Sequence, residues 1–214
     1  MRAYYWGVVI CAVLVVLSVG FVDRPMAHLT HDAIGRNALF LGLTRIPEGL
    51  AALAVPLVVV LGLVRMRRGR LAGVSHVGFL AGLSMIVAEA IKNALKLAFG
   101  RTWPETWINH NPSFIDNGVY GFFPFHGGPG WGSFPSGHMT IVTAAMGVFW
   151  LLWPRWRGIY LLPVVATATG VFAMDYHFVA DLIGGGFLGF AVAAATVRIA
   201  AVPAVVGPPD DQAS

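Results

Sequence analysis

Two histidines stand out in this sequence because each occupies a position where an imidazole can act on a bound anion. His138 lies in the segment FPSGHMT (residues 134–140), where a glycine-rich loop leads into an apolar helix. The start of a helix presents unpaired N–H groups and the positive end of the helix dipole, which together can bind a phosphate. The Ser136 hydroxyl and the Gly137 amide lie at the same place. This segment therefore predicts an anion site beside an imidazole.

The second histidine, His177, is followed by Asp181 in the segment HFVAD. On a helix these two positions share a face, so the carboxylate can accept a hydrogen bond from one ring nitrogen. That bond fixes the tautomer and leaves the other nitrogen free to act as a nucleophile. Either histidine alone is also compatible with a solvated side chain at a helix end. The two indicate catalysis only if the fold brings them together.

A stripe of polar residues lies in the apolar segment 71–99. Its members follow helical steps of three and four residues: Glu89, Lys92, Asn93 and Lys96. A charge near the centre of a membrane helix costs on the order of 2.5–3.5 kcal/mol, so the stripe must face protein or a wet cavity. Lys92 is open to two interpretations, an ion pair with Glu89 or a site residue. Lys96 precedes a flexible exit that contains Arg101, and these two cations favour anion capture.

The elements that must position these residues are membrane helices. Hydrophobic residues make up 57% of the 214-residue chain and charged residues only 11%, whereas a soluble domain carries roughly 25% charged residues. The net charge of +4 does not indicate nucleic-acid binding, because the arginines cluster in short tracts between apolar runs. The single cysteine, Cys11, allows no internal disulfide and is interpreted as a packing residue.

We expect an all-α bundle of six transmembrane helices. The six apolar runs are residues 4–22, 49–64, 71–99, 136–153, 159–174 and 177–199, and a span takes roughly 20 residues. The first run resembles a signal peptide, but it lacks a convincing cleavage site and is interpreted as an uncleaved helix. A short interfacial helix is expected over residues 33–43. The membrane domain then covers residues 1–202, and the proline-rich residues 203–214 form a disordered cytoplasmic tail.

Six spans place both termini on one side of the membrane. The arginine tracts share that side, which is therefore expected to be the cytoplasm; they contain Arg65, Arg67, Arg68, Arg70, Arg155, Arg157 and Arg198. The loop 100–135 and both histidines fall on the opposite, extracytoplasmic face of a bacterial inner membrane. Because the segment 102–134 is too aromatic for disorder, we expect it to form a lid over the site. For His126 within it, a structural role is favoured over contact with the phosphate.

These residues resemble the three-part motif of the type 2 phosphatidic acid phosphatases, which share a helical core with vanadium haloperoxidases and bacterial acid phosphatases. The first part, a lysine, six residues and Arg-Pro, is matched at Lys96 and Pro104. The second, PSGH, is matched in full at residues 135–138. The third ends in a histidine, three residues and an aspartate, matched at His177 and Asp181. The resemblance covers about residues 90–190 and includes the six-span layout of the family's membrane members.

Two arginines of the family pattern are replaced in this chain. Trp103 occupies the arginine position of the first part, and Gly170 and Val171 occupy the Ser-Arg position of the third. Neither arginine role is carried over to these residues. Arg101 lies two residues before the first position, and we expect its long side chain to substitute as a phosphate ligand.

The resemblance implies a mechanism that agrees with the residue chemistry. His177 attacks phosphorus and forms a phosphohistidine, with Asp181 orienting the ring. His138 protonates the leaving oxygen and then activates water. The phosphate oxygens are held by four further residues, Lys96, Arg101, Ser136 and Gly137. No metal or other cofactor is expected.

The resemblance implies an integral-membrane lipid phosphate phosphatase, acting at the outer leaflet on a phospholipid or isoprenoid (pyro)phosphate. Phosphatidic acid, phosphatidylglycerol phosphate, undecaprenyl pyrophosphate and a lipid A phosphate are the candidate substrates. The expected partners are this substrate and membrane lipids, with no nucleic acid. Two alternatives stay open. One is a lipid phosphotransferase that uses the same histidines, and the other is a catalytically silent lipid-binding or transport protein that retains the fold.

Overall fold

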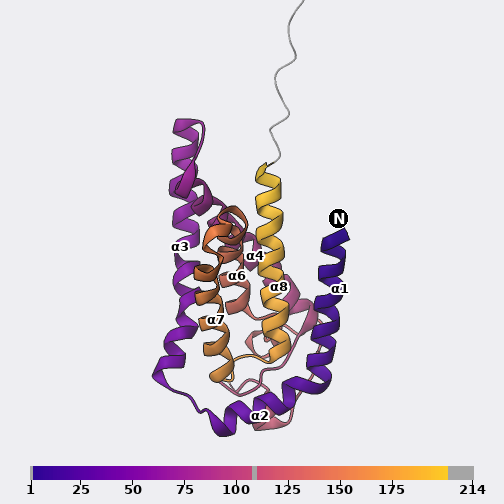
Figure 1. The fold of residues 1–214 in the computed structure, drawn as a ribbon. Helices are drawn as coiled ribbons and strands as arrows, with labels where there is room; N and C mark the ends of the chain where they lie inside the picture. The colour runs from indigo at the N-terminus through magenta and orange to yellow at the C-terminus, as the bar shows by residue number, and fades with distance from the viewer. Residues whose placement is uncertain (1, 108–109, 202–214) are drawn as a thin grey trace, which may run out of the picture.

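The chain forms a bundle of helices in a computed structural model that describes residues 2–107 and 110–201 (Figure 1). The described part contains no strand beyond three isolated backbone bridges, so the expected all-α class is confirmed. The tail predicted for residues 203–214 lies outside the described residues. The elements are α1 (Arg2–Leu17), η1 (Ser18–Val22), α2 (Asp23–Ala33), α3 (Ala38–Arg68), α4 (Gly73–Phe99), α5 (Phe114–Asn117), η2 (Pro129–Trp131), α6 (Gly137–Leu152), η3 (Pro154–Trp156), α7 (Arg157–Ala173) and α8 (Val179–Ala201).

Five helical stretches of the described chain are long and apolar enough to cross a membrane. They are Tyr4–Ala33, Ala38–Arg68, Gly73–Phe99, Pro154–Ala173 and Val179–Ala201. The shorter apolar helix α6, with 16 residues, would be about 24 Å long at 1.5 Å per residue. The chain is therefore a multi-pass membrane protein, and the predicted count of six spans is approximate.

The interfacial helix predicted over residues 33–43 is wrong. The first helix instead continues through the π-helical turn η1 into α2, and the chain reverses at residues 34–37. Gly35 lies there at φ 65°, in the left-handed region that glycine adopts freely. The Asn37 side chain then caps α3 by accepting a hydrogen bond from the Phe40 amide, at 3.1 Å. Helix α3 consequently begins eleven residues earlier than the span predicted from residue 49.

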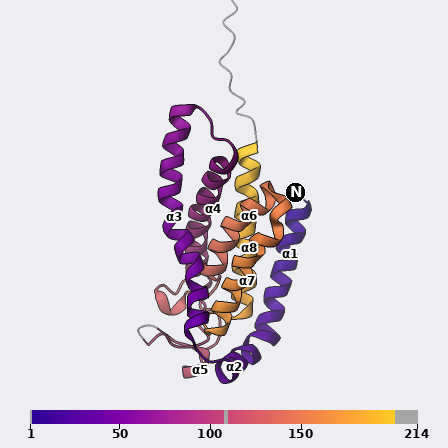
Figure 2. The same ribbon diagram turned by 60° about the vertical axis from the view of Figure 1, so that its left-hand side comes forward.

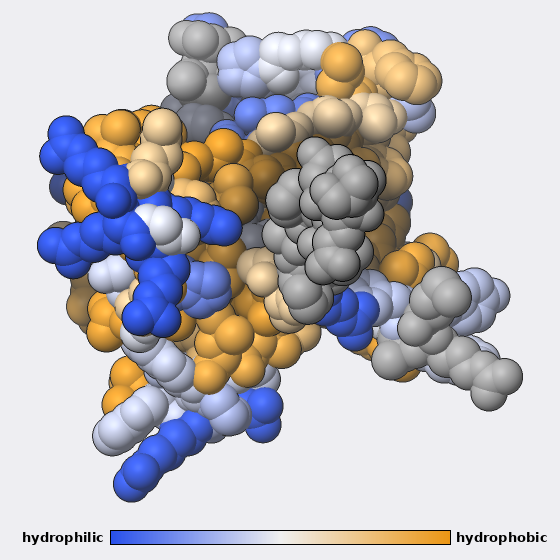
Figure 3. Space-filling model, turned by 90° about the horizontal axis from the view of Figure 1, so that it is seen from above, coloured by the Kyte–Doolittle hydropathy of each residue, from blue (hydrophilic) through white to orange (hydrophobic). Residues whose placement is uncertain are grey.

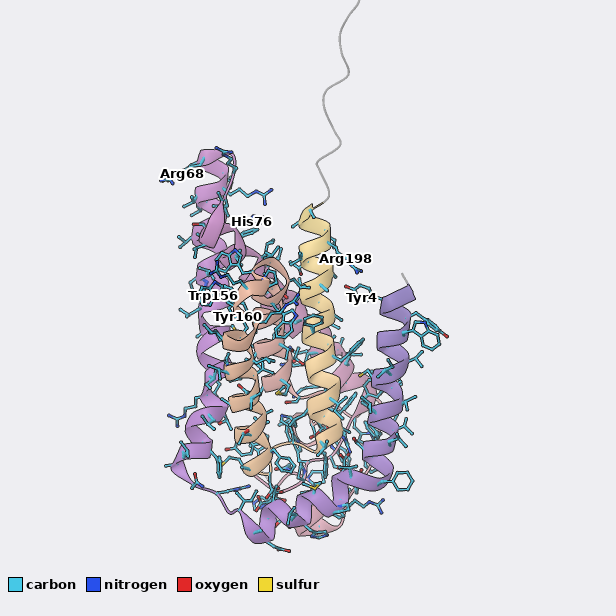
Figure 4. All side chains as sticks on the ribbon, in the orientation of Figure 1. Tyr4, Arg68, His76, Trp156, Tyr160 and Arg198 are labelled. Carbon is cyan, nitrogen blue, oxygen red and sulfur yellow. The ribbon has the colours of Figure 1, made fainter. Side chains whose placement is uncertain are left out.

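The two ends of the bundle differ in composition. Arg68 and Arg198 lie at one end, where the Arg198 guanidinium is 4.3 Å from the centre of the Tyr4 ring (Figure 4). Seen from this end, hydrophilic side chains project around a hydrophobic surface (Figure 3). Helix α2 and the loop segments lie at the opposite end (Figures 1 and 2). The arginine tracts and the loop 100–135 are thus separated along the bundle axis, as predicted.

Helix α6 packs against α3, α4, α7 and α8 and has nine buried residues. Its contact with α8 depends on glycine, because a Cβ atom at Gly185 would lie 2.4 Å from the Ser136 carbonyl oxygen. A Cβ atom at Gly189 would likewise lie 2.3 Å from the Thr140 carbonyl oxygen. Small residues let two membrane helices bring their backbones into contact. This close approach places the start of α8 beside the PSGH segment.

Candidate active site

His177 lies in the turn before α8, with its Nδ1 atom 3.5 Å from Oδ2 of Asp181. The predicted pairing of the two residues is therefore present. The imidazole is only 3% exposed, and this burial lowers its pKa below the usual value, an effect that Asp181 opposes. A neutral ring with Nδ1 directed at a carboxylate keeps the lone pair on Nε2. His177 can thus act as a nucleophile at neutral pH.

The Asp181 carboxylate is fully buried and held by several donors. Its Oδ1 accepts from Nη1 of Arg101 at 2.5 Å, and its Oδ2 accepts from the Ser133 hydroxyl at 2.6 Å. The Phe178 amide also donates to Oδ2, at 3.0 Å. These bonds fix the carboxylate and favour its ionised form. Asp181 can therefore orient His177 and stabilise a positive charge on its ring.

His138 lies in the first turn of α6, and its ring centroid is 5.8 Å from that of His177. The structure brings together the two histidines that the sequence singled out. The Ser136 hydroxyl caps α6 by accepting from the Met139 amide at 3.4 Å, and the side chain is fully buried. Gly137 lies at the first position of α6 and lines the cavity described next.

A cavity of about 420 Å³ opens in front of the two histidines. The residues that line it come from α3, α4, α6 and the loops, and they are Pro47, Glu48, Ala51, Glu89, Lys92, Lys96, Trp103, Trp107, Gly137, His138, Ile141, Tyr176 and His177. The Lys92 ammonium pairs with Glu89 at 2.6 Å, and it would lie 3.4 Å from a Cβ atom at Gly137. The ion pair with Glu89 is therefore present, and Lys92 also lines the cavity. Two lysines and a helix start face one space, which suits a phosphate group.

Trp103, which replaces a family arginine, forms a wall of the cavity. Its ring centroid lies 5.2 Å from that of His177 and 5.0 Å from that of Trp107. The Lys96 ammonium lies 5.4 Å from the centre of the Trp103 ring. The indole nitrogen donates to the Pro129 carbonyl at 2.7 Å, which fixes the ring. An aromatic surface thus occupies a position where the family pattern has a cation.

The structure places Arg101 behind Asp181, outside the residues that line the cavity. Its side chain is fully buried, with Nη2 bonded to Oδ2 of Asp23 at 2.5 Å and Nη1 bonded to Asp181. Burial alone would lower the pKa of the guanidinium, but the two carboxylates raise it above its usual value. The role expected for Arg101 as a phosphate ligand is not compatible with this geometry, because both of its terminal nitrogens bind carboxylates.

Asp23 and Ser133 are the site residues that sequence reasoning missed. Asp23 directly follows an apolar run, where a charge ordinarily marks the end of a span, and it is 78 residues from its partner Arg101. Ser133 lies in a glycine-rich loop with no local pattern. Neither residue carries a signal that reasoning from one sequence could have used. His126 contacts the Trp131 and Phe123 rings, with centroids 4.8 Å and 6.0 Å away, so it packs within the loop.

Comparison with known proteins agrees with this geometry. Residues 78–202 match the PAP2 superfamily, which covers more than half of the chain and contains the histidines and Asp181. The chain belongs to the PAP2 superfamily.

Two similar relatives are described as lipid A 1-phosphatases. The protein from Rhizobium johnstonii is 32% identical over 112 residues, which cover 52% of this chain and 43% of the relative. The protein from Rhizobium etli is also 32% identical over 112 residues, covering 52% of this chain and 45% of the relative. The matched part thus spans less than half the length of these relatives.

The fold resembles the crystal structure of a transmembrane PAP2-type phosphatidylglycerolphosphate phosphatase from Bacillus subtilis. The TM-score is 0.54 at 17% sequence identity, and the superposition covers 90% of this chain and 94% of the other. At this identity the likeness shows the fold alone. It extends beyond the matched segment to most of the bundle.

Proposed function

We propose that this chain is a lipid phosphate phosphatase that works through a phosphohistidine at His177. The observation that carries the proposal is the position of His177, which has Asp181 at Nδ1 and lines a cavity that also contains two lysines and His138. An imidazole buried against a carboxylate and facing cations is arranged to attack a phosphate ester. The PAP2 membership supports the same chemistry.

The reaction proceeds in two steps. Nε2 of His177 attacks phosphorus, the bond from phosphorus to the lipid oxygen breaks, and His138 donates a proton to that oxygen. His138 then takes a proton from a water molecule, which attacks the phosphohistidine and releases phosphate. Asp181 stabilises the positive ring in between. The non-bridging oxygens are held by Lys92, Lys96 and the amides at the start of α6.

The substrate is a phosphorylated membrane lipid whose head enters the cavity while its tails stay in the bilayer. Residues Pro47, Glu48 and Ala51 of α3 border the cavity, and α3 also exposes large apolar side chains such as Leu53 and Val59. Such a surface suits contact with lipid. The names of the relatives make a lipid A phosphate the first substrate to test, and phosphatidylglycerol phosphate the second.

The site is proposed to face the extracytoplasmic side of a bacterial inner membrane. Arg68 and Arg198, which belong to the arginine tracts, lie at the opposite end of the bundle (Figure 4), and arginine and lysine in short loops favour the cytoplasm. A cysteine-accessibility experiment on intact cells tests this, because a cysteine at Arg68 should be protected from an impermeant reagent and one at Phe125 should react.

The decisive experiment measures phosphate release from a panel of lipid phosphates in detergent, with His177→Ala and a matched control. His76→Ala is the control, because His76 lies at the arginine end of the bundle (Figure 4) and does not line the cavity. We expect His177→Ala to abolish release and acid-labile phosphoenzyme labelling, and His76→Ala to retain both. Label that passes to an added lipid acceptor would assign a phosphotransferase. Bound lipid without turnover on any substrate would contradict the proposal.

A further inference from the structure

Behind His177 lies a network of three charged side chains, Asp23, Arg101 and Asp181, each with no exposed side-chain surface. Arg101 joins the two carboxylates with bonds of 2.5 Å on either side. The other oxygen of Asp23, Oδ1, accepts from the Ala180 amide at 2.9 Å. Asp23 therefore holds both the arginine that binds Asp181 and the backbone of the residue before Asp181.

Asp23 reaches this place because of the π-helical turn η1. The turn ends at Asp23, whose amide donates to the Ser18 carbonyl. Inside the turn, the Val19 carbonyl accepts from the Tyr120 hydroxyl at 2.8 Å, and this hydroxyl lies 3.3 Å from Oδ2 of Asp23. Tyr120 also accepts from Nη2 of Arg101 at 3.2 Å. Short π-helical turns within helices occur frequently at functional sites.

The charges of the network explain why a second carboxylate is needed. Arg101 alone would cancel the negative charge of Asp181, and the positive ring that forms at His177 would then have no net counter-charge. With Asp23 present, two carboxylates and one guanidinium leave one net negative charge. That charge balances one imidazolium. In a buried site with a low local dielectric, such a balance affects the energy of the charged intermediate strongly.

We propose that Asp23 is a positioning residue of this active site, which binds Arg101 so that Asp181 keeps a net negative charge for His177. The turn η1 and the start of α2, which precede the segment matched to the family, thereby support the catalytic site. This inference rests on the proposed function, because it assumes that His177 becomes positively charged during turnover.

Several other charged or titratable groups face His177 and are kept constant in the test. They are Glu48 on α3, Glu89, Lys92 and Lys96 on α4, His138 on α6, Asp181 on α8, and Tyr176, which directly precedes His177 in the loop. Neither Asp23 nor Arg101 lines the cavity, so changes at these two positions leave the phosphate ligands in place.

The test compares Asp23→Asn with wild type and with Asp32→Asn, a change at an exposed aspartate of the same helix α2. We expect Asp23→Asn to lower kcat by about 10- to 100-fold, as misplacement of a site group does, with little change in KM. The acid limb of kcat/KM should move to lower pH by about one unit, because losing a nearby negative charge disfavours the protonated ring of His177. Asp32→Asn should match wild type in all three quantities.

A double variant separates charge balance from packing. Asp23→Asn/Arg101→Gln again leaves one net negative charge, on Asp181, so its acid limb should return to the wild-type position. The Asp181 carboxylate of this variant loses Arg101 but keeps its bonds from the Ser133 hydroxyl and the Phe178 amide, and thermal unfolding shows whether each variant is folded. Two outcomes would overturn the inference. One is an acid limb that stays displaced in the double variant, and the other is an Asp23→Asn variant whose melting temperature falls while its kcat and acid limb match wild type. Wild-type protein without phosphatase activity would instead refute the proposed function.

Discussion

The two sides of the His177 imidazole have opposite character. On the cavity side lie the cations Lys92 and Lys96, the start of α6 and His138. On the interior side lie two carboxylates that share one guanidinium, all without exposed surface. The cavity side can bind an anion, while the interior side can stabilise a positive ring. A nucleophile that attacks an anionic phosphate and becomes cationic needs both environments at once.

The same comparison shows what occupies the positions of the two family arginines. At one of these positions Trp103 contributes an aromatic wall, and at the other the buried Val171 contributes no charge. Lys92 lies close enough to Gly137 to supply a cation in the cavity. Arg101, two residues before Trp103, lies on the interior side. Changes on the two sides should therefore differ in their readout.

The largest effect is expected for Asp181→Asn, on the interior side. An amide can hold the ring in place but cannot stabilise its positive charge, and it favours the wrong tautomer. By analogy with hydrolase triads, kcat should fall about 10⁴-fold. Steady-state phosphate release and phosphoenzyme trapping measure this. A loss below tenfold would show that the interior charge is not used.

His138→Gln removes the proton donor on the cavity side. For a lipid phosphate we expect a loss of about 10²- to 10⁴-fold in kcat. An aryl phosphate with an acidic phenol needs no proton at its leaving oxygen, so its first step should survive and phosphoenzyme should accumulate. Rapid-quench kinetics with both substrates measure this difference. Equal losses in the first step for the two substrates would contradict the assignment.

Arg101→Met should affect stability more than phosphate binding. It leaves two buried carboxylates without their shared partner, and breaking a buried ion pair from one side costs about 3–5 kcal/mol. Thermal unfolding in detergent should show the loss, and the KM of any folded protein should be near that of wild type. A strongly raised KM with unchanged stability would instead return Arg101 to the phosphate site.

Lys96→Met tests the cavity side by binding. Loss of one charge-assisted contact of about 1.5–3 kcal/mol corresponds to roughly a 10- to 150-fold weaker interaction. We expect a higher KM and weaker inhibition by inorganic phosphate, with little change in melting temperature. Arg45→Met, at an exposed residue of α3, is the control. Unaltered phosphate inhibition would remove Lys96 from the site.

The smallest effect concerns Asp175, which lies two residues before His177 in the chain and accepts a hydrogen bond from Thr30. Burial raises the pKa of this carboxyl to about 6 from 3.8, so the folded chain prefers the protonated form and the free energy of unfolding falls as pH rises through this interval. Asp175→Asn should stabilise the chain by about 1–3 kcal/mol at pH 7.5 and not at pH 3.5. Asparagine can also accept the Thr30 hydrogen bond and tolerates the φ of 52° found there. Unfolding measured at both pH values checks this, and an equal gain at each would exclude titration as the cause.

Much of the fold was predictable because membrane helices are long apolar runs whose backbone must bond within each segment. The spans around α4, α7 and α8 were placed within a few residues. The boundary between α2 and α3 was not, since it depends on the Asn37 cap and on a π-helical turn that lets a charged residue continue an apolar helix. Hydropathy alone predicts that the first span ends before Asp23, because Asp23 is charged. In the structure the helix continues through Asp23, whose charge is paired with Arg101.

The sequence by itself determined the helical class and the separation of the arginine tracts from the PSGH segment, because these follow from composition. It also predicted the pairing of His177 with Asp181, although His177 lies in the turn before α8 and the 3.5 Å contact is made across the start of that helix. The tertiary structure decided which cations face the cavity and which face the buried carboxylates. Lys92, Lys96 and Arg101 lie within ten residues of one another, but their surroundings come from α6, α8 and α2, far along the chain. Burial and partner charge, which set the role of each cation, exist only after those helices have packed.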